Sequence, residues 1–301
     1  MPNWIDVLKE IDALESQNKD IIKSLDFVRR KYLKKVSEKT GRNTIAYYSG
    51  WLHNPKSQDT AVNDKDISGF MLNVHGLDRS KGLDLILHTP GGNIAATEAL
   101  VSYLKSMFKN DIRAIIPQLS MSAGTMIALS TKEIIMGKHS SLGPIDPQLG
   151  GVPCHGVINE FNRARKDIMA DPKSAALWQF IIQKYNPTLL GSCDYAIKWS
   201  DKLVLGWLKE NMCLGKDAVA RKILKNFSDH NRQKSHSRHI SALQCKKFGV
   251  KVIELEADND LQDLVLTTHH AFMHTFSETF TVKIIENQLG VAYMENIDPP
   301  R

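Results

Sequence analysis

Between Leu83 and Gly137 the sequence alternates three apolar segments with two helical ones, and this alternation constrains the fold more than any other feature. The apolar segments cover 83–89, 112–118 and 133–137, and helical patterns cover 93–108 and 122–130. Uniformly apolar strands linked by helices are typical of parallel strands that are buried on both faces. The sequence therefore predicts an α/β domain built on a parallel sheet.

Other periodic segments flank this core. Helical periodicity covers residues 3–38 and ends near Gly41, and "NTIAYYSGWL" has the composition of a strand. A short helix is expected at 67–76, several helices after 151, a helix–strand unit at 240–256 and a long helix over 261–294. We expect three parts: an N-terminal helical segment over 1–42, the main domain over 43–260 and a C-terminal helical extension over 261–301.

Composition narrows the class of protein. No apolar run in the 301 residues approaches the roughly 18 residues of a spanning helix, and the N-terminal sequence lacks the pattern of a signal peptide. The four cysteines are widely spaced and match neither a metal motif nor a dense disulfide framework. We expect a cytoplasmic protein with reduced thiols, no metal and no cofactor.

The formal net charge of +6 comes largely from basic clusters at 29–35 and 232–239. Such clusters can hold phosphate or nucleic acid. Aromatic residues do not alternate with these charges, and no nucleic-acid motif is present. A solvated helix face is the favoured interpretation, so we expect no nucleic-acid partner.

Two glycine-containing turns occupy equivalent positions, each after a strand and before a helix. They are "HTPGGN" and "LSMSAGT", and in an open α/β sheet both would lie at the carboxyl ends of strands, where ligands bind. Glycine lets backbone N–H groups point outward, and two such groups aimed at one point form an oxyanion hole. Either turn alone is usually structural, but the pairing of the two favours a site.

Three serines lie near the second turn: Ser120, Ser122 and Ser130. Ser122 belongs to the Ser-x-Gly element at the turn itself. At the start of a helix, the macrodipole favours developing negative charge. These features make Ser122 the candidate for an acyl-accepting nucleophile.

Several segments together resemble a known group of proteases. "LILHTPGGNIAATEALVSYLK", "SMSAGTMIALS" and "SSLGPIDPQLGG" are similar to Clp-type and signal-peptide-peptidase-A-type serine proteases. With "RRKYLKK", "YYSGWL", "SHSRHIS" and "TVKIIENQLG", the chain more closely resembles the prokaryotic family of serine dehydrogenase proteinases. The likeness covers most of the chain, and its specificity lies in the combination of motifs.

The resemblance implies a crotonase-like spiral of stacked ββα units with added N- and C-terminal helices. It implies Ser122 as nucleophile, the backbone N–H groups of Gly92 and Ala123 as oxyanion hole, a protein or peptide substrate, and self-assembly into homo-oligomers. Despite the family's name, the sequence has no GxGxxG dinucleotide fingerprint, so dehydrogenase activity has no support.

The general base is where the sequence departs from the Clp pattern. Asp146 occupies the position of the usual histidine, and Ser237 aligns near the usual aspartate. A serine–lysine dyad is one alternative, because a buried lysine with a depressed pKa can take the serine proton. Lys184 follows an apolar helix face and ranks first for that role. The other candidate lysines are Lys166 and Lys173.

The other alternative exchanges the roles of the acid and the histidine. His236 or His239 would pair with Asp146, and histidine is the usual general base near neutral pH. The sequence favours the lysine base, Lys184 first, and the pairing of a histidine with Asp146 is the alternative.

Three functions are consistent with the motifs. A serine peptidase is favoured, a crotonase-type acyl-CoA enzyme would share the fold and the oxyanion hole, and a catalytically silent scaffold would use the fold for assembly. The amphipathic N-terminal helix could pack on a partner subunit or touch a membrane surface. Packing on a partner is the favoured alternative.

Overall fold

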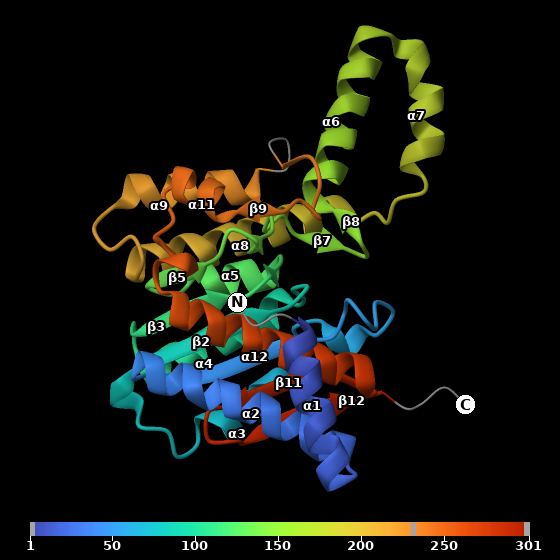
Figure 1. Cartoon of the computed structure of the whole chain (residues 1–301). Coiled ribbons are helices and arrows are strands. Elements are labelled where there is room, and N and C mark those ends of the chain that lie inside the picture. Colours follow the sequence, from blue (N-terminus) through green and yellow to red (C-terminus); the bar gives the residue numbers. More distant parts are fainter. Residues whose placement is uncertain (1–3, 230–232, 298–301) are drawn as a thin grey trace.

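The computed structural model describes residues 4–229 and 233–297 (Figure 1). A seven-stranded sheet, in the order β10-β5-β3-β2-β1-β11-β12, runs through its middle. The strands from β10 to β1 are parallel, whereas β11 is antiparallel to β1 and β12 to β11. The bounds are β1 Asn43–Ser49, β2 Leu83–His88, β3 Ile112–Ile116, β5 Glu133–Met136, β10 Val252–Glu254, β11 Thr281–Asn287 and β12 Ala292–Asn296. The predicted α/β class with a parallel core is confirmed.

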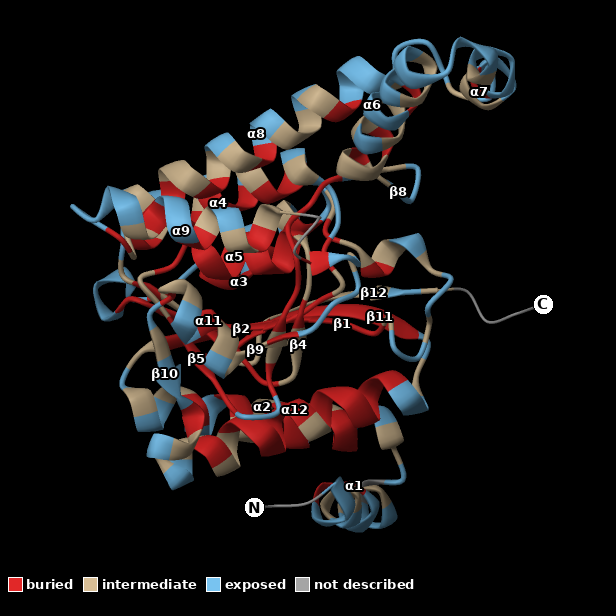
Figure 2. Cartoon of the chain, turned by 90° about the horizontal axis from the view of Figure 1, so that it is seen from above, coloured by how far each residue is buried: buried red, intermediate tan, exposed pale blue. Residues whose placement is uncertain are grey.

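Helices cover both faces of this sheet (Figure 2). On one face, α2 and α12 pack on the sheet through residues such as Leu33 and Phe272, and α1 lies outside them. On the other face, α3, α4, α5 and α8 bury a second apolar cluster, which includes Phe70 and Leu100. The bounds are α1 Trp4–Asn18, α2 Ile21–Thr40, α3 Asp66–Val74, α4 Ile94–Phe108, α5 Ala123–Leu129, α8 Leu189–Glu210, α9 Asp217–Ser228, α11 Ala242–Phe248 and α12 Asn259–Glu278.

A second, small sheet joins the turns at the carboxyl ends of the main strands. It has the order β4-β6-β9, with bounds Leu119–Ser120, Ser141–Leu142 and Ile240–Ser241. The main strands β3 and β5 are each followed by one of these short strands, and the succession β3-β4-α5 forms one ββα unit. The spiral arrangement that the resemblance implies is therefore present around α5.

A helical hairpin projects away from the body at the level of the small sheet (Figure 1). It consists of α6 (Cys154–Ala170) and α7 (Ala175–Ile182), and a short hairpin of β7 (Gln148–Leu149) and β8 (Val152–Pro153) precedes it. Because the body does not cover α7, Leu177 and Phe180 are 63% and 71% exposed. In the described part of the chain, no helix combines the length and apolarity that crossing a bilayer requires.

The C-terminal segment differs from the expected long helix. The helix α12 ends at Glu278, and residues 281–296 form β11 and β12 at the edge of the main sheet. The β-branched run "TVKII" favours a strand, and Gly290, at φ +80°, lies in the connection between the two strands. The expectation of a purely helical extension after 260 was wrong: the polar stretch 277–279 ends α12, and the strand pattern starts after it.

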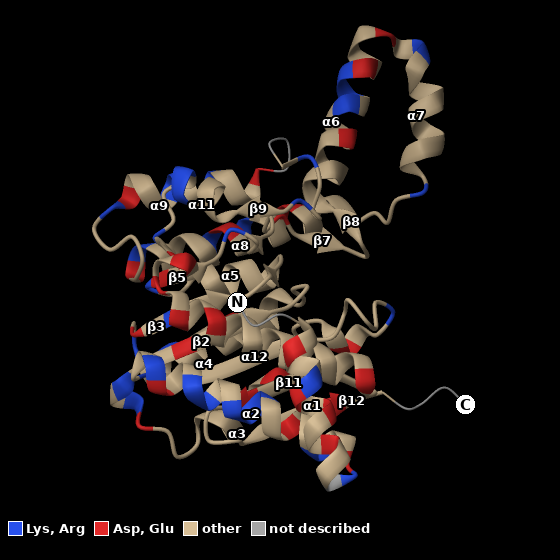
Figure 3. Cartoon of the chain, viewed as in Figure 1, with Lys and Arg blue, Asp and Glu red and all other residues tan. Residues whose placement is uncertain are grey.

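The basic cluster at 29–35 is largely paired within the chain. Arg29 is fully buried, which corrects the expectation of a wholly solvated face, and its Nε donates to Glu286 Oε2 at 2.5 Å. Arg30 also binds Glu286, and Lys31 binds Glu10. Figure 3 shows blue and red segments alternating where α1 and α2 meet. These bonds tie α2 to β11 and α1, so the cluster has a structural role.

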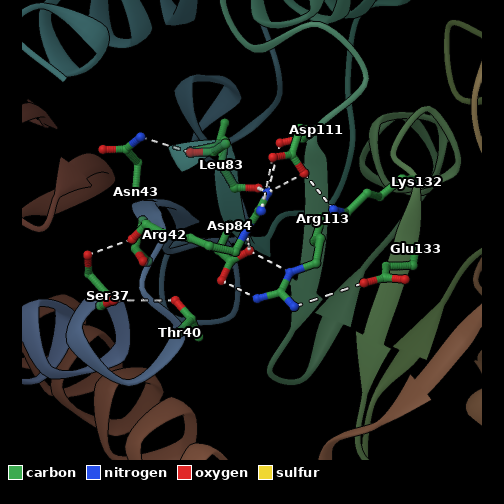
Figure 4. A network of polar contacts seen from close by, with 12 residues as sticks. Ser37, Thr40, Arg42, Asn43, Leu83, Asp84, Asp111, Arg113, Lys132 and Glu133 are labelled. Carbon is green, nitrogen blue, oxygen red and sulfur yellow. Dashed lines mark hydrogen bonds and ion pairs between the residues drawn. The ribbon is translucent and has the colours of Figure 1, made fainter. Parts of the chain in front are cut away.

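The amino ends of the main strands are held by a separate ionic network (Figure 4). Asp84 on β2 is fully buried and accepts two bonds from Arg113 on β3, both at 2.7 Å. The Nε of Arg42, just before β1, donates to the same carboxylate at 2.8 Å. Arg42 and Lys132 also bind Asp111. This network fixes strand positions at the edge opposite the two glycine-containing turns.

Buried histidines make the stability of the fold depend on pH. Burial lowers the pKa of His88 to about 3 and that of His269 well below its usual value. Below the ordinary histidine pKa of about 6.5 the unfolded chain therefore binds protons that the folded chain does not. The free energy of unfolding should fall as pH decreases from about 6.5 toward 3.

We predict that His88→Phe flattens this dependence by about 1.4 kcal/mol per pH unit over that range. Urea unfolding at several pH values measures it. The matched control is His75→Gln, at an exposed histidine, which should leave the slope unchanged. Parallel curves for wild type and His88→Phe would contradict the role of His88.

Candidate active site

A pocket of about 260 Å³ opens where the two glycine-containing turns meet. Gly91 and Gly92 line it from the turn after β2, and Ser122 and Ala123 line it from the turn before α5. His236 lines it from the segment before β9. The structure therefore brings together residues from three separate stretches of the chain.

Backbone hydrogen bonds hold the two turns side by side. Met121 N donates to Thr89 O at 2.9 Å, and Thr89 N donates to Leu119 O at 3.2 Å. The approach is so close that a Cβ atom on Gly91 would lie 2.6 Å from Ser122 Cβ. Gly91 also has φ +94°, so a side chain there would be strained as well as crowded. The turn after β2 needs glycine for both reasons.

Ser122 has the backbone conformation of a strained turn. Its φ is +48° and its ψ −115°, values that L-residues adopt only when the surrounding structure holds them. It is half-buried and lines the pocket. By contrast, Ser120 is fully buried, and the Ser130 hydroxyl donates to Ile127 O at 2.7 Å. Of the three candidate serines, only Ser122 faces the pocket.

Two backbone N–H groups flank Ser122 without hydrogen-bond partners. Within the described chain, neither Gly92 N–H nor Ala123 N–H donates a bond to another protein group. Ala123 is the first residue of α5, where the first N–H groups of a helix lack intrahelical partners. Both residues line the pocket, so their N–H groups are available to a carbonyl or an oxyanion there.

His236 and Asp146 form a hydrogen-bonded pair at the edge of this pocket. The distance from His236 Nδ1 to Asp146 Oδ1 is 2.8 Å, and the side chains are 23% and 1% exposed. A carboxylate accepts only, so it favours the tautomer with the proton on Nδ1 and leaves Nε2 able to accept one. His239, the other candidate histidine, is exposed and does not line the pocket.

The candidate lysines lie elsewhere. Lys166, Lys173 and Lys184 are exposed residues of the α6–α7 hairpin, and none lines the pocket. The expectation of a partly buried place for Lys184 is wrong, because Lys184 is exposed, as are Leu177 and Phe180 of the preceding helix. Nothing in the geometry desolvates these ammonium groups.

A buried ion pair next to the pocket is absent from the residues that the sequence pattern singled out. Lys283 and Asp66 are 0% and 1% exposed and lie 2.7 Å apart, between β11 and the start of α3. A lysine within a strand pattern gives no signal of burial. The only sequence feature that could have suggested it is the apolar surroundings of Lys283 in "TVKII".

Comparison with known proteins agrees with the fold. A sequence model of the ClpP-like SDH-type serine proteinase family matches residues 19–265, and the chain belongs to this family. Among curated proteins, it is similar to the uncharacterized protein MJ0137 of Methanocaldococcus jannaschii, with 30% identity over 54% of this chain and 60% of that protein. It is also similar to the uncharacterized protein MJ1495 of the same organism, with 29% identity over 56% of this chain and 51% of that protein. The chain thus spans a little more than half the length of these relatives.

We predict that a fluorophosphonate probe modifies Ser122, because its hydroxyl alone among the three serines reaches the pocket. Peptide mapping by mass spectrometry locates the adduct in wild type. Ser122→Ala should lose the label, while Ser120→Ala and Ser130→Ala, at sites that do not face the pocket, serve as controls. Label that persists in Ser122→Ala and disappears in another serine variant would contradict the assignment.

Proposed function

We propose that this chain is a serine peptidase that cleaves protein or peptide through an acyl-enzyme at Ser122. One observation carries the proposal: Ser122 and His236 line the same pocket, and Asp146 holds the imidazole from behind. Hydroxyl and imidazole are the pair that acyl transfer to serine uses. Membership of a ClpP-like serine proteinase family supports the same reaction class.

In this proposal His236 is the general base and Asp146 its orienting partner. Nε2 of His236 takes the proton of the Ser122 hydroxyl as the oxygen attacks the substrate carbonyl. The same nitrogen then returns the proton to the leaving amine, and water releases the acyl group by the reverse sequence. Asp146 stabilises the imidazolium that forms between these steps.

The N–H groups of Gly92 and Ala123 would receive the oxyanion. Donors aimed at developing charge act more strongly in the transition state than in the ground state, which is how they accelerate the reaction. The strained φ of Ser122 supports this arrangement, because the turn that it forms carries both the Ser122 hydroxyl and the Ala123 N–H.

Apolar side chains form the wall of the pocket beside the reacting groups. Ile94, Met126 and Ile145 are among them. Such a wall accepts an apolar substrate side chain better than a charged one, because burial of a charge without a partner is costly. We therefore expect the best substrates to have an apolar residue before the scissile bond.

Other expectations from the sequence stay predictions. Self-association into a homo-oligomer is one, and the exposed apolar residues of α7 offer a surface of the kind that marks interaction sites. The absence of a nucleic-acid partner and of a cofactor are others, as is the cytoplasmic location.

The proposal is tested by the pH dependence of hydrolysis. Histidines ordinarily titrate near 6.5 and lysines near 10.4, so a histidine base gives activity that rises through the slightly acidic range and then levels off. We predict that shape for wild type on a peptide with an apolar residue before the scissile bond. His236→Ala should lower kcat at least ~10³-fold, since removal of a base from a catalytic set has effects of this order.

Lys184→Ala and His239→Ala are the matched controls, because both side chains are exposed and outside the pocket. They should keep the activity of wild type. If Lys184→Ala is inactive while His236→Ala is active, a serine–lysine dyad replaces the proposed arrangement. If wild type hydrolyses no peptide and takes no fluorophosphonate, the scaffold function is supported instead.

A further inference from the structure

The position of Gly92 depends on one neighbouring residue, Val62. Val62 N donates to Gly91 O at 2.8 Å, and Asn93 N donates to Val62 O at 2.9 Å, so Val62 bonds the residues on both sides of Gly92. A Cβ atom on Gly92 would lie 2.4 Å from both Val62 N and Val62 O. The direction of the Gly92 N–H is therefore set by the backbone at Val62.

The backbone at Val62 is in turn held on both sides by a buried ion pair. Lys283 Nζ donates to the carbonyl of Ala61 at 2.8 Å and to Asp66 Oδ1 at 2.7 Å. The other oxygen of Asp66 accepts from Asn63 N at 3.0 Å. Lys283 thus fixes the residue before Val62, and Asp66 fixes the residue after it.

Tyr47 completes this arrangement. Its hydroxyl donates to Asp66 Oδ2 at 2.7 Å, and burial together with the Asp66 carboxylate raises the pKa of Tyr47 well above its usual value. The phenol therefore stays a donor over the working pH range. Both oxygens of Asp66 have partners, which keeps the carboxylate in one position.

A buried ion pair is an inefficient way to stabilise a fold. Desolvation of two charges offsets much of their attraction, and apolar replacements of similar size are often neutral or stabilising. An apolar side chain at position 283 could fill the space between β11 and α3 but could not bind the carbonyl of Ala61. The contact that only Lys283 provides is the bond to the Ala61 carbonyl. Ala61 precedes Val62, whose backbone binds the Pro90–Gly92 turn.

We propose that Lys283 and Asp66 are positioning residues for the oxyanion hole, which hold the Gly92 N–H in its catalytic direction through residues 61–63. The inference rests on the proposed peptidase function. Neither side chain lines the pocket. Their loss should leave substrate binding intact and weaken a hydrogen bond that forms fully only in the transition state.

The decisive variant is Lys283→Met/Asp66→Asn, which removes both charges of the pair together. Glu295, whose Oε2 lies 3.9 Å from Lys283 Nζ, keeps its contacts with Lys65 and Tyr293 through Oε1. The readouts are the maximal rate of Ser122 phosphonylation by a fluorophosphonate, its half-saturating concentration and the thermal midpoint. We expect a 10- to 100-fold lower maximal rate, below the ~10²–10³-fold that loss of a whole donor causes. The half-saturating concentration should stay within about 2-fold, as expected when only transition-state binding is lost.

The chain offers a control in the Arg113–Asp84 ion pair, whose side chains are 19% and 0% exposed, at the opposite edge of the same sheet (Figure 4). Arg113→Met/Asp84→Asn should lower the thermal midpoint and leave the phosphonylation rate of the folded protein within about 3-fold, because distant sites act independently. Equal rate losses in the two double variants would overturn the positioning role. An unchanged rate in Lys283→Met/Asp66→Asn would overturn it as well.

Two further measurements keep the inference separable from folding and from the proposed function. If Lys283→Met/Asp66→Asn does not fold, Asp66→Asn is compared with Asp84→Asn, and only Asp66→Asn should slow phosphonylation, by 5-fold or more.

Hydrogen–deuterium exchange of the peptide that contains residues 89–95 should be faster in Lys283→Met/Asp66→Asn than in Arg113→Met/Asp84→Asn. Equal exchange there contradicts the inference. A wild type that takes no label contradicts the peptidase proposal, and the exchange result then decides the positioning claim by itself.

Discussion

The structure of the site depends on the close approach of backbone segments at two positions without side chains. Gly91 lies against Ser122, and Gly92 lies against Val62, each at a distance that a Cβ atom would occupy. Parallel strands β2 and β3 deliver the two turns to one edge of the sheet, and hydrogen bonds between Thr89 and residues 119–121 join them. The sheet and the helices that cover it hold the two turns at this distance.

The same approach explains how Ser122 is held at the start of a short buried helix. Gly124 packs so tightly that a Cβ atom there would lie 2.4 Å from Thr89 Cγ2. Thr125 Oγ1 donates to Ser120 O and accepts from Gly143 N, which connects the start of α5 to the stretch that leads to Asp146. The strained conformation of Ser122 is therefore held from both sides, by the preceding short strand and by the following helix.

The sequence predicted the parallel strands of the main sheet and the two turns, because apolar periodicity and glycine placement are local signals, and the role of Ser122 stays a prediction. It misjudged residues 281–296, because the predicted helix was extended across the polar residues 277–279 that separate α12 from β11. It favoured Lys184 over the histidines as the base, because the approach of His236 to Asp146 joins residues 90 positions apart and only the fold reveals it. Lys184 was misplaced because an apolar helix face indicates burial only when another element covers it, and α7 projects from the body (Figure 1). Lys283 gave no sign of its role, since its partners are a backbone carbonyl and a carboxylate more than 200 residues away.

The central claim is that Ser122 attacks a carbonyl whose oxygen lies between two backbone N–H groups. A crystal structure of the protein after reaction with a fluorophosphonate tests it most directly. The account predicts a tetrahedral phosphorus on Ser122 Oγ, with one oxygen about 2.7–3.1 Å from the nitrogens of both Gly92 and Ala123. It also predicts that Nε2 of His236 faces Ser122 Oγ. A phosphorus on another residue, or an oxygen that points to solvent while both N–H groups remain unbound, would contradict the account.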